Sequence, residues 1–394
     1  MEQTDSSKSG RDHKHSEQID PALEQPPLLS SEKTKSFKSN YYPEVTQNQW
    51  NSWKWQIRNS ITSYKDLQRI FGSSDYELSE DINLPLRITP YYASLITNLN
   101  DSIGKCVIPT SNELIVMPNE ENDSLHEEHQ SPVTCIVHRY PDRVLFLTTD
   151  FCSSYCRYCT RSHMVGHTKI TRKNWDEGIQ YIKDHSEIRD VLLSGGDFLL
   201  LSDENIEYLL KEIRTIKHVE FLRIGTKTVV SVPQRITIKL AKILRKYRVF
   251  VNIHFTHPNE ITPEVERACD ILVDHGIPLF SQTVLLKSVN DNIEIMKSLM
   301  HKLLMIRIKP YYLYIADRVV GTHHFRTSIT KGIEIIRGLR GYTSGMAIPT
   351  LILDSQYGKI DISDNIISKE NNTYELRTYK NKIIKYKEEK FETI

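Results

Sequence analysis

The sequence lacks any long hydrophobic run. No window of its 394 residues approaches the roughly 18 consecutive apolar residues of a membrane-spanning helix, and the N-terminal segment MEQTDSSKSGRDHKHSEQID has no apolar core like that of a secretory signal. An excess of one charge is also missing, because 51 Lys and Arg balance 50 Asp and Glu, whereas a protein that binds a nucleic-acid backbone needs a basic excess. We therefore expect a cytoplasmic protein with no membrane and no nucleic-acid partner.

Cysteine is scarce and unevenly placed. The chain has six cysteines: Cys106, Cys135, Cys152, Cys156, Cys159 and Cys269. In a large chain from a reducing compartment, cysteines rarely form a disulfide scaffold, so the three that fall between residues 152 and 159 indicate metal binding or redox chemistry. The chain beyond Cys269 has no cysteine at all.

Composition divides the chain into four parts. Residues 1–40 are rich in Ser, Lys, Glu, Gln and Asp and poor in large apolar side chains, which predicts a disordered leader. Residues 41–130 contain helical patterns and predict a helical N-terminal region. Residues 131–345 contain strand-like runs and predict the main domain, and residues 346–394 form a C-terminal segment with a polar tail.

Short apolar, β-branched runs recur through the middle of the chain. Six of them begin at Arg143, Asp190, Glu220, Val249, Ile277 and Arg307, with helical patterns between them. These strand–helix units predict an α/β fold with a parallel sheet, and the lack of a glycine-rich nucleotide loop favours a partial (β/α)6 TIM-type barrel over an open doubly wound sheet. In such barrels the active site lies at the carboxyl ends of the strands. Those ends carry polar side chains here: Cys152, Ser194 to Asp197, His254, Gln282 and Asp317.

The segment CSSYCRYC places Cys152, Cys156 and Cys159 directly after the first expected strand. Three thiolates on one loop can hold three irons of a [4Fe–4S] cluster and leave the fourth iron without a protein ligand. A zinc knuckle with His163 as the fourth ligand is the alternative. The Cys-x3-Cys-x2-Cys spacing at this position in a barrel resembles the radical SAM superfamily, in which the open iron chelates S-adenosylmethionine (SAM) and an electron from the cluster releases a 5′-deoxyadenosyl radical.

Longer segments resemble the lysine 2,3-aminomutase family. They include HRYPDRVLFLTTDFCSSYCRYCTR, RDVLLSGGD, RIGTKTVVSVPQRIT, NIHFTHPNEIT and KPYYLYIAD, and the resemblance runs from about Trp50 to Lys359. It implies a radical SAM barrel with pyridoxal phosphate (PLP), an isomerase that moves an α-amino group to the β-carbon, and an electron donor such as flavodoxin or ferredoxin. A radical suits this reaction because a β C–H bond has no useful acidity, and PLP adds a π-bond for the nitrogen shift.

The resemblance also implies roles for individual residues. Lys359 is the expected Schiff-base lysine of PLP, and the expected phosphate ligands are Arg139, Tyr140 and Arg143. The expected SAM contacts are Ser194, Gly195, Gly196, Asp197, His254 and Gln282. The expected substrate contacts are Arg161, for the α-carboxylate, and the acid pair Asp317 and Asp354, for a distal cation.

Several features depart from the family pattern. The loop before Lys359 is shorter than usual and contains Tyr357, and Tyr158 stands where relatives have a histidine near the phosphate. The run CTRSHMVG around Arg161 replaces a more basic one. The C-terminal cysteines that hold zinc in relatives are absent, and Cys269 alone does not make a zinc site, so we expect no structural zinc.

Three functions fit these residues. The favoured one is a 2,3-aminomutase for free L-lysine, because an acid pair suits a cationic side chain and would repel an acidic one. Arginine 2,3-aminomutase is the second, since a guanidinium also suits paired carboxylates. The third is a catalytically inactive relative that keeps the iron–sulfur cluster as an interaction module. The sequence leaves the oligomeric state open, with a homo-oligomer among the options.

Overall fold

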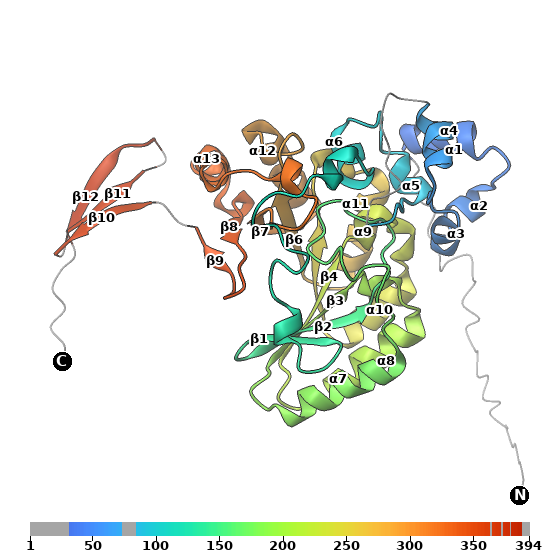
Figure 1. Cartoon of the computed structure of the whole chain (residues 1–394), viewed down its shortest axis with the longest axis horizontal. Helices are drawn as coiled ribbons and strands as arrows, with labels where there is room; N and C mark the ends of the chain where they lie inside the picture. The colour runs from blue at the N-terminus through green and yellow to red at the C-terminus, as the bar shows by residue number, and fades with distance from the viewer. Residues whose placement is uncertain (1–30, 73–83, 363–364, 372, 379, 388–394) are drawn as a thin grey trace, which may run out of the picture.

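A nine-stranded sheet forms the centre of the molecule (Figure 1). The structure, a computed structural model, describes residues 31–72, 84–362, 365–371, 373–378 and 380–387. The strands follow one another in chain order: β1 (Ile136–Tyr140), β2 (Arg143–Thr149), β3 (Asp190–Gly195), β4 (Phe221–Thr226), β5 (Phe250–His254), β6 (Leu279–Leu285), β7 (Lys309–Ile315), β8 (Thr350–Leu353) and β9 (Ile360–Asp361). Strands β2 to β8 are parallel, while β1 and β9 run antiparallel at the two edges.

This arrangement confirms the α/β partial barrel. The six expected strands correspond to β2 through β7, and β8 extends the parallel sheet because it pairs with β7, Tyr312 lying opposite Thr350. The expected domain boundary at residue 345 is therefore wrong, since β8 and β9 beyond it belong to the barrel sheet. A strand of only four residues offers too little periodicity for the sequence to reveal it.

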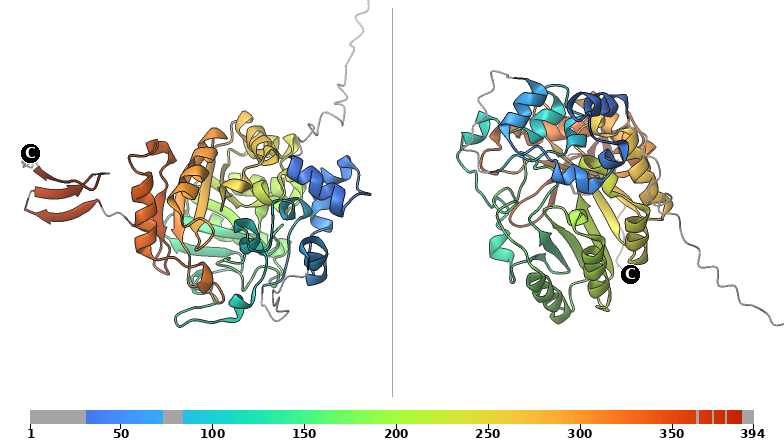
Figure 2. Two further views of the ribbon diagram at one scale, coloured as in Figure 1. Left: turned by 90° about the horizontal axis from the view of Figure 1, so that it is seen from above. Right: turned by 90° about the vertical axis from the view of Figure 1, so that its right-hand side faces the viewer.

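Helices follow the parallel strands and cover one face of the sheet (Figures 1 and 2). They are α7 (Arg172–Asp184), α8 (Asp203–Arg214), α9 (Thr228–Ser231), α10 (Ile238–Lys246), α11 (Pro263–Asp274), α12 (Ile293–Met305) and α13 (Ile329–Leu339). Short 3-10 turns lie in the connections between strands and helices: η4 (Phe198–Leu200), η5 (Pro233–Arg235), η6 (Pro258–Glu260), η7 (His323–Phe325) and η8 (Gly345–Ala347). Helix α8 is representative, because Ser202 caps its first turn and its buried side chains recur at the spacing of one helical face.

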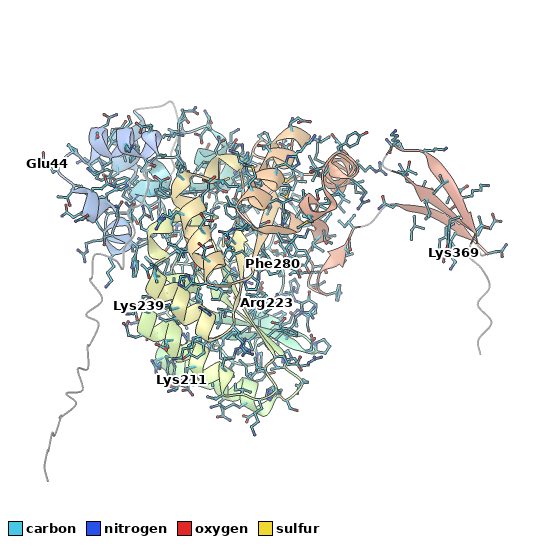
Figure 3. All side chains as sticks on the ribbon, turned by 180° about the vertical axis from the view of Figure 1, so that it is seen from behind. Glu44, Lys211, Arg223, Lys239, Phe280 and Lys369 are labelled. Carbon is cyan, nitrogen blue, oxygen red and sulfur yellow. The ribbon has the colours of Figure 1, made fainter. Side chains whose placement is uncertain are left out.

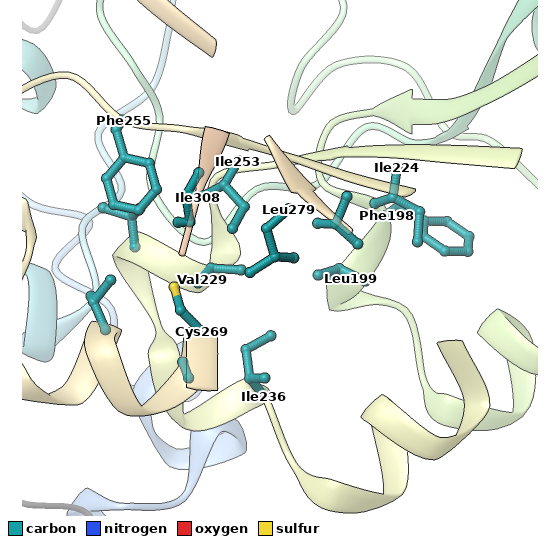
Figure 4. Packing of buried hydrophobic residues seen from close by; sticks show 14 of the residues in the cluster. Phe198, Leu199, Ile224, Val229, Ile236, Ile253, Phe255, Cys269, Leu279 and Ile308 are labelled. Atoms are coloured by element: carbon teal, nitrogen blue, oxygen red, sulfur yellow. The ribbon is translucent and has the colours of Figure 1, made fainter. Parts of the chain in front are cut away.

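The main hydrophobic core lies between the sheet and these helices (Figure 4). Ile224, Ile253 and Leu279 come from three neighbouring strands and pack in one cluster with Val229 of α9 and Cys269 of α11. Cys269 is fully buried, and burial raises the pKa of its thiol. It therefore acts here as a core side chain. In the described part of the chain, no helix is both long and apolar enough to cross a bilayer.

The N-terminal region consists of short helices joined by loops. They are α1 (Glu32–Tyr41), α2 (Gln47–Trp50), α3 (Trp53–Arg58), α4 (Tyr64–Phe71), α5 (Pro90–Ala93), α6 (Ser102–Val107), η2 (Ser111–Leu114) and η3 (Glu128–Gln130). Helix α1 corrects the expected leader, which was to be disordered up to residue 40. Phe37 is buried on α1, and the Tyr41 hydroxyl donates to the Ile70 carbonyl at 2.6 Å. One buried aromatic ring anchors a segment whose average composition is polar. Residues 1–30 of that leader lie outside the described residues.

A second sheet follows the barrel. It contains β10 (Ile366–Glu370), β11 (Thr373–Arg377) and β12 (Ile383–Lys387), all antiparallel. Figures 1 and 2 show it standing apart from the barrel, beyond α13. The segment predicted as a polar tail thus contains a small sheet, and the lysine expected to hold PLP lies before it, between β8 and β9.

Candidate active site

A cavity of about 800 Å³ opens inside the barrel. Its walls include every site residue named from the sequence: Arg139, Tyr140, Arg143, Cys152, Cys156, Cys159, Arg161, Ser194, Gly195, Gly196, Asp197, His254, Gln282, Asp317, Asp354 and Lys359. The strands themselves also contribute walls, among them Arg223 on β4 and Phe280 on β6, which Figure 3 labels. Residues that lie far apart in the chain therefore share one cavity because the strands order them around it.

The three clustered cysteines lie on the loop that follows β2, here named the cluster loop (residues 150–161). Arg157 anchors this loop, since its buried guanidinium pairs with Glu113 at 2.5 Å and donates to the carbonyls of Leu84 and Pro85 at 2.9 and 3.0 Å. Removing one partner of such a buried pair typically costs about 3–5 kcal/mol. These buried contacts hold the cluster loop against the N-terminal region of the protein.

Burial raises the pKa of all three thiols, that of Cys159 to about 11, and neighbouring thiols raise the pKa values of Cys152 and Cys159 further. Iron ligation deprotonates cysteine and would offset this cost. In the described part of the chain, no three His, Cys, Asp or Glu side chains converge on a single metal position. The donor set nevertheless fits an iron–sulfur cluster, because three thiols of one loop line the same cavity. His163 is the fourth ligand in the zinc alternative, and its Nε2 lies 3.9 Å from Oε1 of Glu128.

The end of β3 packs directly against the cluster loop. Gly196 permits this contact, because a Cβ at that position would lie 2.6 Å from the Phe151 backbone nitrogen. Gly195 has a φ of +112°, a conformation that strongly favours glycine. The Asp197 carboxylate accepts hydrogen bonds from the Thr226 hydroxyl at 2.7 Å and the Lys227 backbone at 2.8 Å. Asp197 therefore ties the end of β3 to the end of β4.

His254 lies at the end of β5 against the cluster loop. Its Nε2 is 2.9 Å from the Tyr158 hydroxyl, and the two rings stack with centroids 5.6 Å apart. Burial and the nearby Lys227 lower the pKa of His254 to about 3, so the ring is neutral. The Tyr158 hydroxyl also lies 2.8 Å from Thr256 Oγ1. Tyr158 thus contacts His254 and Thr256, two residues outside the set expected around the phosphate.

A second loop, between β8 and β9, carries the expected PLP lysine and is named the lysine loop (residues 354–359). Lys359 Nζ lies 2.5 Å from Asp354 Oδ2, and its backbone N–H donates to the Tyr140 hydroxyl at 2.9 Å. Gly358, with a φ of +112°, makes the turn that brings the loop against the Tyr140 ring. The short loop therefore still presents the lysine amine to the cavity.

Arg139 on β1 is engaged by the protein on several sides. Its Nη1 donates to the Ser355 carbonyl at 3.1 Å and lies 3.4 Å from Asp354. Its Nε donates to Gln130 at 2.6 Å, and its Nη2 to the Leu125 carbonyl at 2.7 Å. Two of its three nitrogens therefore donate to the segment of residues 125–131, and the third holds the lysine loop.

Arg143 at the start of β2 differs from Arg139. Its guanidinium lies over the Tyr140 ring at 3.8 Å and pairs with Asp142 at 3.0 Å. This pair is well exposed, with side-chain accessibilities of 39% and 49%, so it contributes little binding energy of its own. Of the two arginines, Arg143 is the one whose guanidinium is more readily available to an anion in the cavity.

The two expected acids differ in their partners. Asp354 is paired with Lys359 and Arg139. Asp317 accepts a hydrogen bond from the Thr160 hydroxyl at 3.0 Å but has no salt-bridge partner within the described residues. Burial, with the Asp354 carboxylate nearby, raises the pKa of Asp317 to about 6. A cation placed at Asp317 would find a half-buried carboxylate that has no salt-bridge partner among the described residues.

Comparisons with known proteins bear on this site. Residues 146–299 match the radical SAM superfamily model. The chain is 47% identical over 366 residues to L-lysine 2,3-aminomutase of Acetoanaerobium sticklandii, covering 90% of this chain and 88% of the relative. The chain belongs to the lysine 2,3-aminomutase family. It is therefore an isomerase, and its superfamily implies a [4Fe–4S] cluster and SAM as cofactors.

Other similar proteins are named for different amino-acid substrates. L-lysine 2,3-aminomutase of Bacillus subtilis is 43% identical, over 88% of this chain and 76% of that protein. Glutamate 2,3-aminomutase of Clostridioides difficile is 41% identical, over 87% of this chain and 84% of that protein. Identity at this level assigns the family and leaves the choice of amino acid to the side chains of the site.

The structure adds two residues to the site that the sequence analysis did not identify. Glu127 lines the cavity and forms a two-pronged pair with Arg161, the residue expected to bind the substrate carboxylate. Lys227, nearly buried at the end of β4, pairs with Glu260 at 2.8 Å. The sequence could have indicated Lys227, because this residue directly follows a predicted strand. No such signal marked Glu127, since it lies in a polar run that looks like surface.

Proposed function

We propose that this protein is a SAM- and PLP-dependent 2,3-aminomutase that acts on a free amino acid with a cationic side chain, with L-lysine as the favoured substrate. The observation that carries the proposal is the unpaired carboxylate of Asp317, which lies beside Asp354 in the same cavity as Lys359. A half-buried carboxylate without a salt-bridge partner costs free energy, and a substrate ammonium would relieve that cost.

The residues present fit the cofactors of this reaction. Cys152, Cys156 and Cys159 would hold the cluster, while the Ser194–Asp197 turn, His254 and Gln282 would contact SAM. Lys359 would attach PLP, with Arg143 and Tyr140 at its phosphate. When bound, the cluster with SAM supplies a radical able to abstract an unactivated hydrogen, and PLP supplies a π system for the migrating amino group.

The chain's own side chains then have binding and positioning roles. Arg161 would bind the α-carboxylate, because a guanidinium fork matches carboxylate geometry. Asp317 would bind the distal cation. His254, held neutral by burial, adds no charge to the cluster side of the cavity. The barrel walls would limit the access of water to the bound groups, which protects reactive species from side reactions.

Substrate charge separates the alternatives. Asp317 and Asp354 would repel the side chain of glutamate, the substrate named for one relative. Arginine fits the same charge pattern, since a guanidinium can bind two carboxylates. The run SHMVG, which follows Arg161, departs from the more basic run of lysine enzymes and is the feature that keeps arginine as the second candidate.

Product analysis tests the proposal. The cluster is reconstituted without oxygen, and the enzyme is incubated with SAM, PLP, dithionite and L-lysine, L-arginine or L-glutamate. We expect β-lysine as the main product, identified by mass spectrometry after derivatisation. A β-amino acid from glutamate alone would contradict the proposal. No product from any of the three, with iron and PLP both bound, would favour the inactive iron–sulfur module.

A further inference from the structure

The segment of residues 125–131, here named the strap, connects the two loops of the site. It includes the 3-10 turn η3, and Glu127 is its N-cap residue. On one side Glu127 binds Arg161 of the cluster loop. On the other side Gln130 Nε2 donates to the Gln356 carbonyl of the lysine loop at 3.1 Å. The strap therefore contacts both cofactor-binding loops directly.

Arg139 reinforces the second connection. It donates to Leu125 and Gln130 of the strap and also to Ser355 of the lysine loop. The positions of Arg161 and Asp354, the expected contacts for the two ends of the substrate, are thus both set relative to the same short segment. A shift of the strap would change the distance between the two ends of the substrate site.

The Glu127–Arg161 pair has the geometry of two parallel hydrogen bonds. Arg161 Nε donates to Oε2 at 2.7 Å, and Nη2 donates to Oε1 at 2.6 Å. Both side chains are largely buried, with 10% of Glu127 and 21% of Arg161 exposed. A guanidinium carries five N–H groups, and Glu127 takes one edge of the fork. The edge formed by Nη1 and Nη2 has the right chemistry to bind a second carboxylate.

We propose that Glu127 is a positioning residue for recognition of the substrate α-carboxylate, because it fixes one edge of Arg161 so that the other edge serves the substrate. This inference rests on the proposed function and deepens it. Glu127 touches neither substrate nor cofactor in this scheme. It acts through Arg161, which without a fixed partner would lose the orientation that a two-pronged carboxylate contact needs.

The pair also sets the charge of the site. The two charge-assisted hydrogen bonds from Glu127 stabilise the guanidinium cation in this largely buried position. Arg161 therefore remains a cation while Glu127 balances its charge. The cavity can hold this buried cation before any substrate arrives, which avoids the cost of an unpaired buried charge.

Ligand titration of the PLP-loaded protein tests the inference without turnover. L-Lysine and 1,5-diaminopentane, which is lysine without its carboxylate, are titrated separately while the PLP absorption band is followed, with no SAM or reductant present. Glu127→Gln should weaken binding of L-lysine about tenfold or more, about 1.4 kcal/mol, and leave 1,5-diaminopentane unchanged. Glu127→Asp, which keeps the charge, should fall between wild type and Glu127→Gln. Glu128→Gln, the matched control on an exposed neighbour, should match wild type.

Each other result has a defined meaning. Equal weakening of the binding of both ligands would show that the salt bridge is purely structural and would overturn the inference. Tighter binding of lysine would also overturn it, because Glu127 would then compete with the substrate carboxylate for Arg161. If Glu127→Gln does not fold, Glu127→Asp decides by the same comparison of the two ligands. Unchanged lysine binding in the variants overturns this inference alone. A wild-type protein that responds to no amino acid overturns the proposed function and the inference with it.

Discussion

The cluster loop and the lysine loop line the same cavity but are held in different ways. Arg157 of the cluster loop has a fully buried side chain in a buried ion pair with Glu113. In the lysine loop, Tyr357 is 87% exposed and the side chain of Lys359 is 33% exposed. The lysine loop depends on a few polar contacts from β1. The cluster side is therefore built into the protein interior, while the lysine side is attached to its surface.

This difference predicts that the two sides can be damaged separately, and the largest effect should come from removing the reactive groups themselves. Lys359→Ala should lower turnover by at least about a thousandfold and abolish borohydride trapping of PLP at residue 359, with iron content unchanged. Cys156→Ala should do the reverse, losing iron while PLP is still trapped. Loss of both cofactors in either variant would contradict the separation.

A smaller but still large effect should come from crowding the cluster side. Gly196→Ala places a Cβ 2.6 Å from the Phe151 backbone nitrogen, and backbone cannot move as a flexible side chain can. We expect destabilisation of about 1–3 kcal/mol and reduced iron binding, measured by thermal unfolding and iron content. Gly345→Ala is the control, because a Cβ there meets no atom within 4 Å. Equal melting temperatures for the two variants would argue against a tightly built cluster side.

The acid pair should give an intermediate effect that depends on pH. Asp317 binds a cation only when ionised, and its pKa is raised to about 6 in the substrate-free protein. Affinity for lysine should therefore fall as pH drops through about 6, approaching a tenfold loss per unit below that value. Asp317→Asn should weaken binding and remove this dependence, which the pH profile of KM will measure. Asp361→Asn, at an exposed position on β9, should keep the wild-type profile.

The smallest effect should come from loosening the lysine side. Tyr140→Phe removes the acceptor of the Lys359 backbone N–H and should cost about 1 kcal/mol in PLP binding, a several-fold rise in Kd. Absorbance titration with PLP measures it. Tyr386→Phe, on the separate sheet, serves as the control. If Tyr140→Phe reduced the free energy of PLP binding by as much as Gly196→Ala reduces the free energy of unfolding, the lysine side would be as rigidly built as the cluster side.

The sequence predicted those parts of the site that depend on local order. Cys152, Cys156 and Cys159 follow a strand at a fixed spacing, and the polar ends of strands point to one rim of a barrel, so these positions follow from periodicity and topology. Helix α1 was missed because averaged polar composition hides one buried side chain, Phe37. The boundary at residue 345 was wrong because β8 is very short.

Contacts between distant segments were beyond such reasoning. The Glu127–Arg161 pair and the engagement of Arg139 by the strap arise only when the barrel brings β1, the strap and the lysine loop together. Neither spacing nor residue type marks Glu127 in the run LHEEHQ. The family resemblance identified Arg161 and Arg139 as site residues. Only the geometry shows which of their N–H groups already donate to other protein groups.

The strand order has a consequence for how the site is assembled during synthesis. The cluster loop follows β2, whereas Lys359 follows β8, so a ribosome makes the cysteines early and the lysine only after the other parallel strands. A nascent chain that has reached β7 carries the thiols but not yet the amine. The capacity to bind the cluster and the capacity to bind the substrate are therefore united only when the last parallel strand has been made.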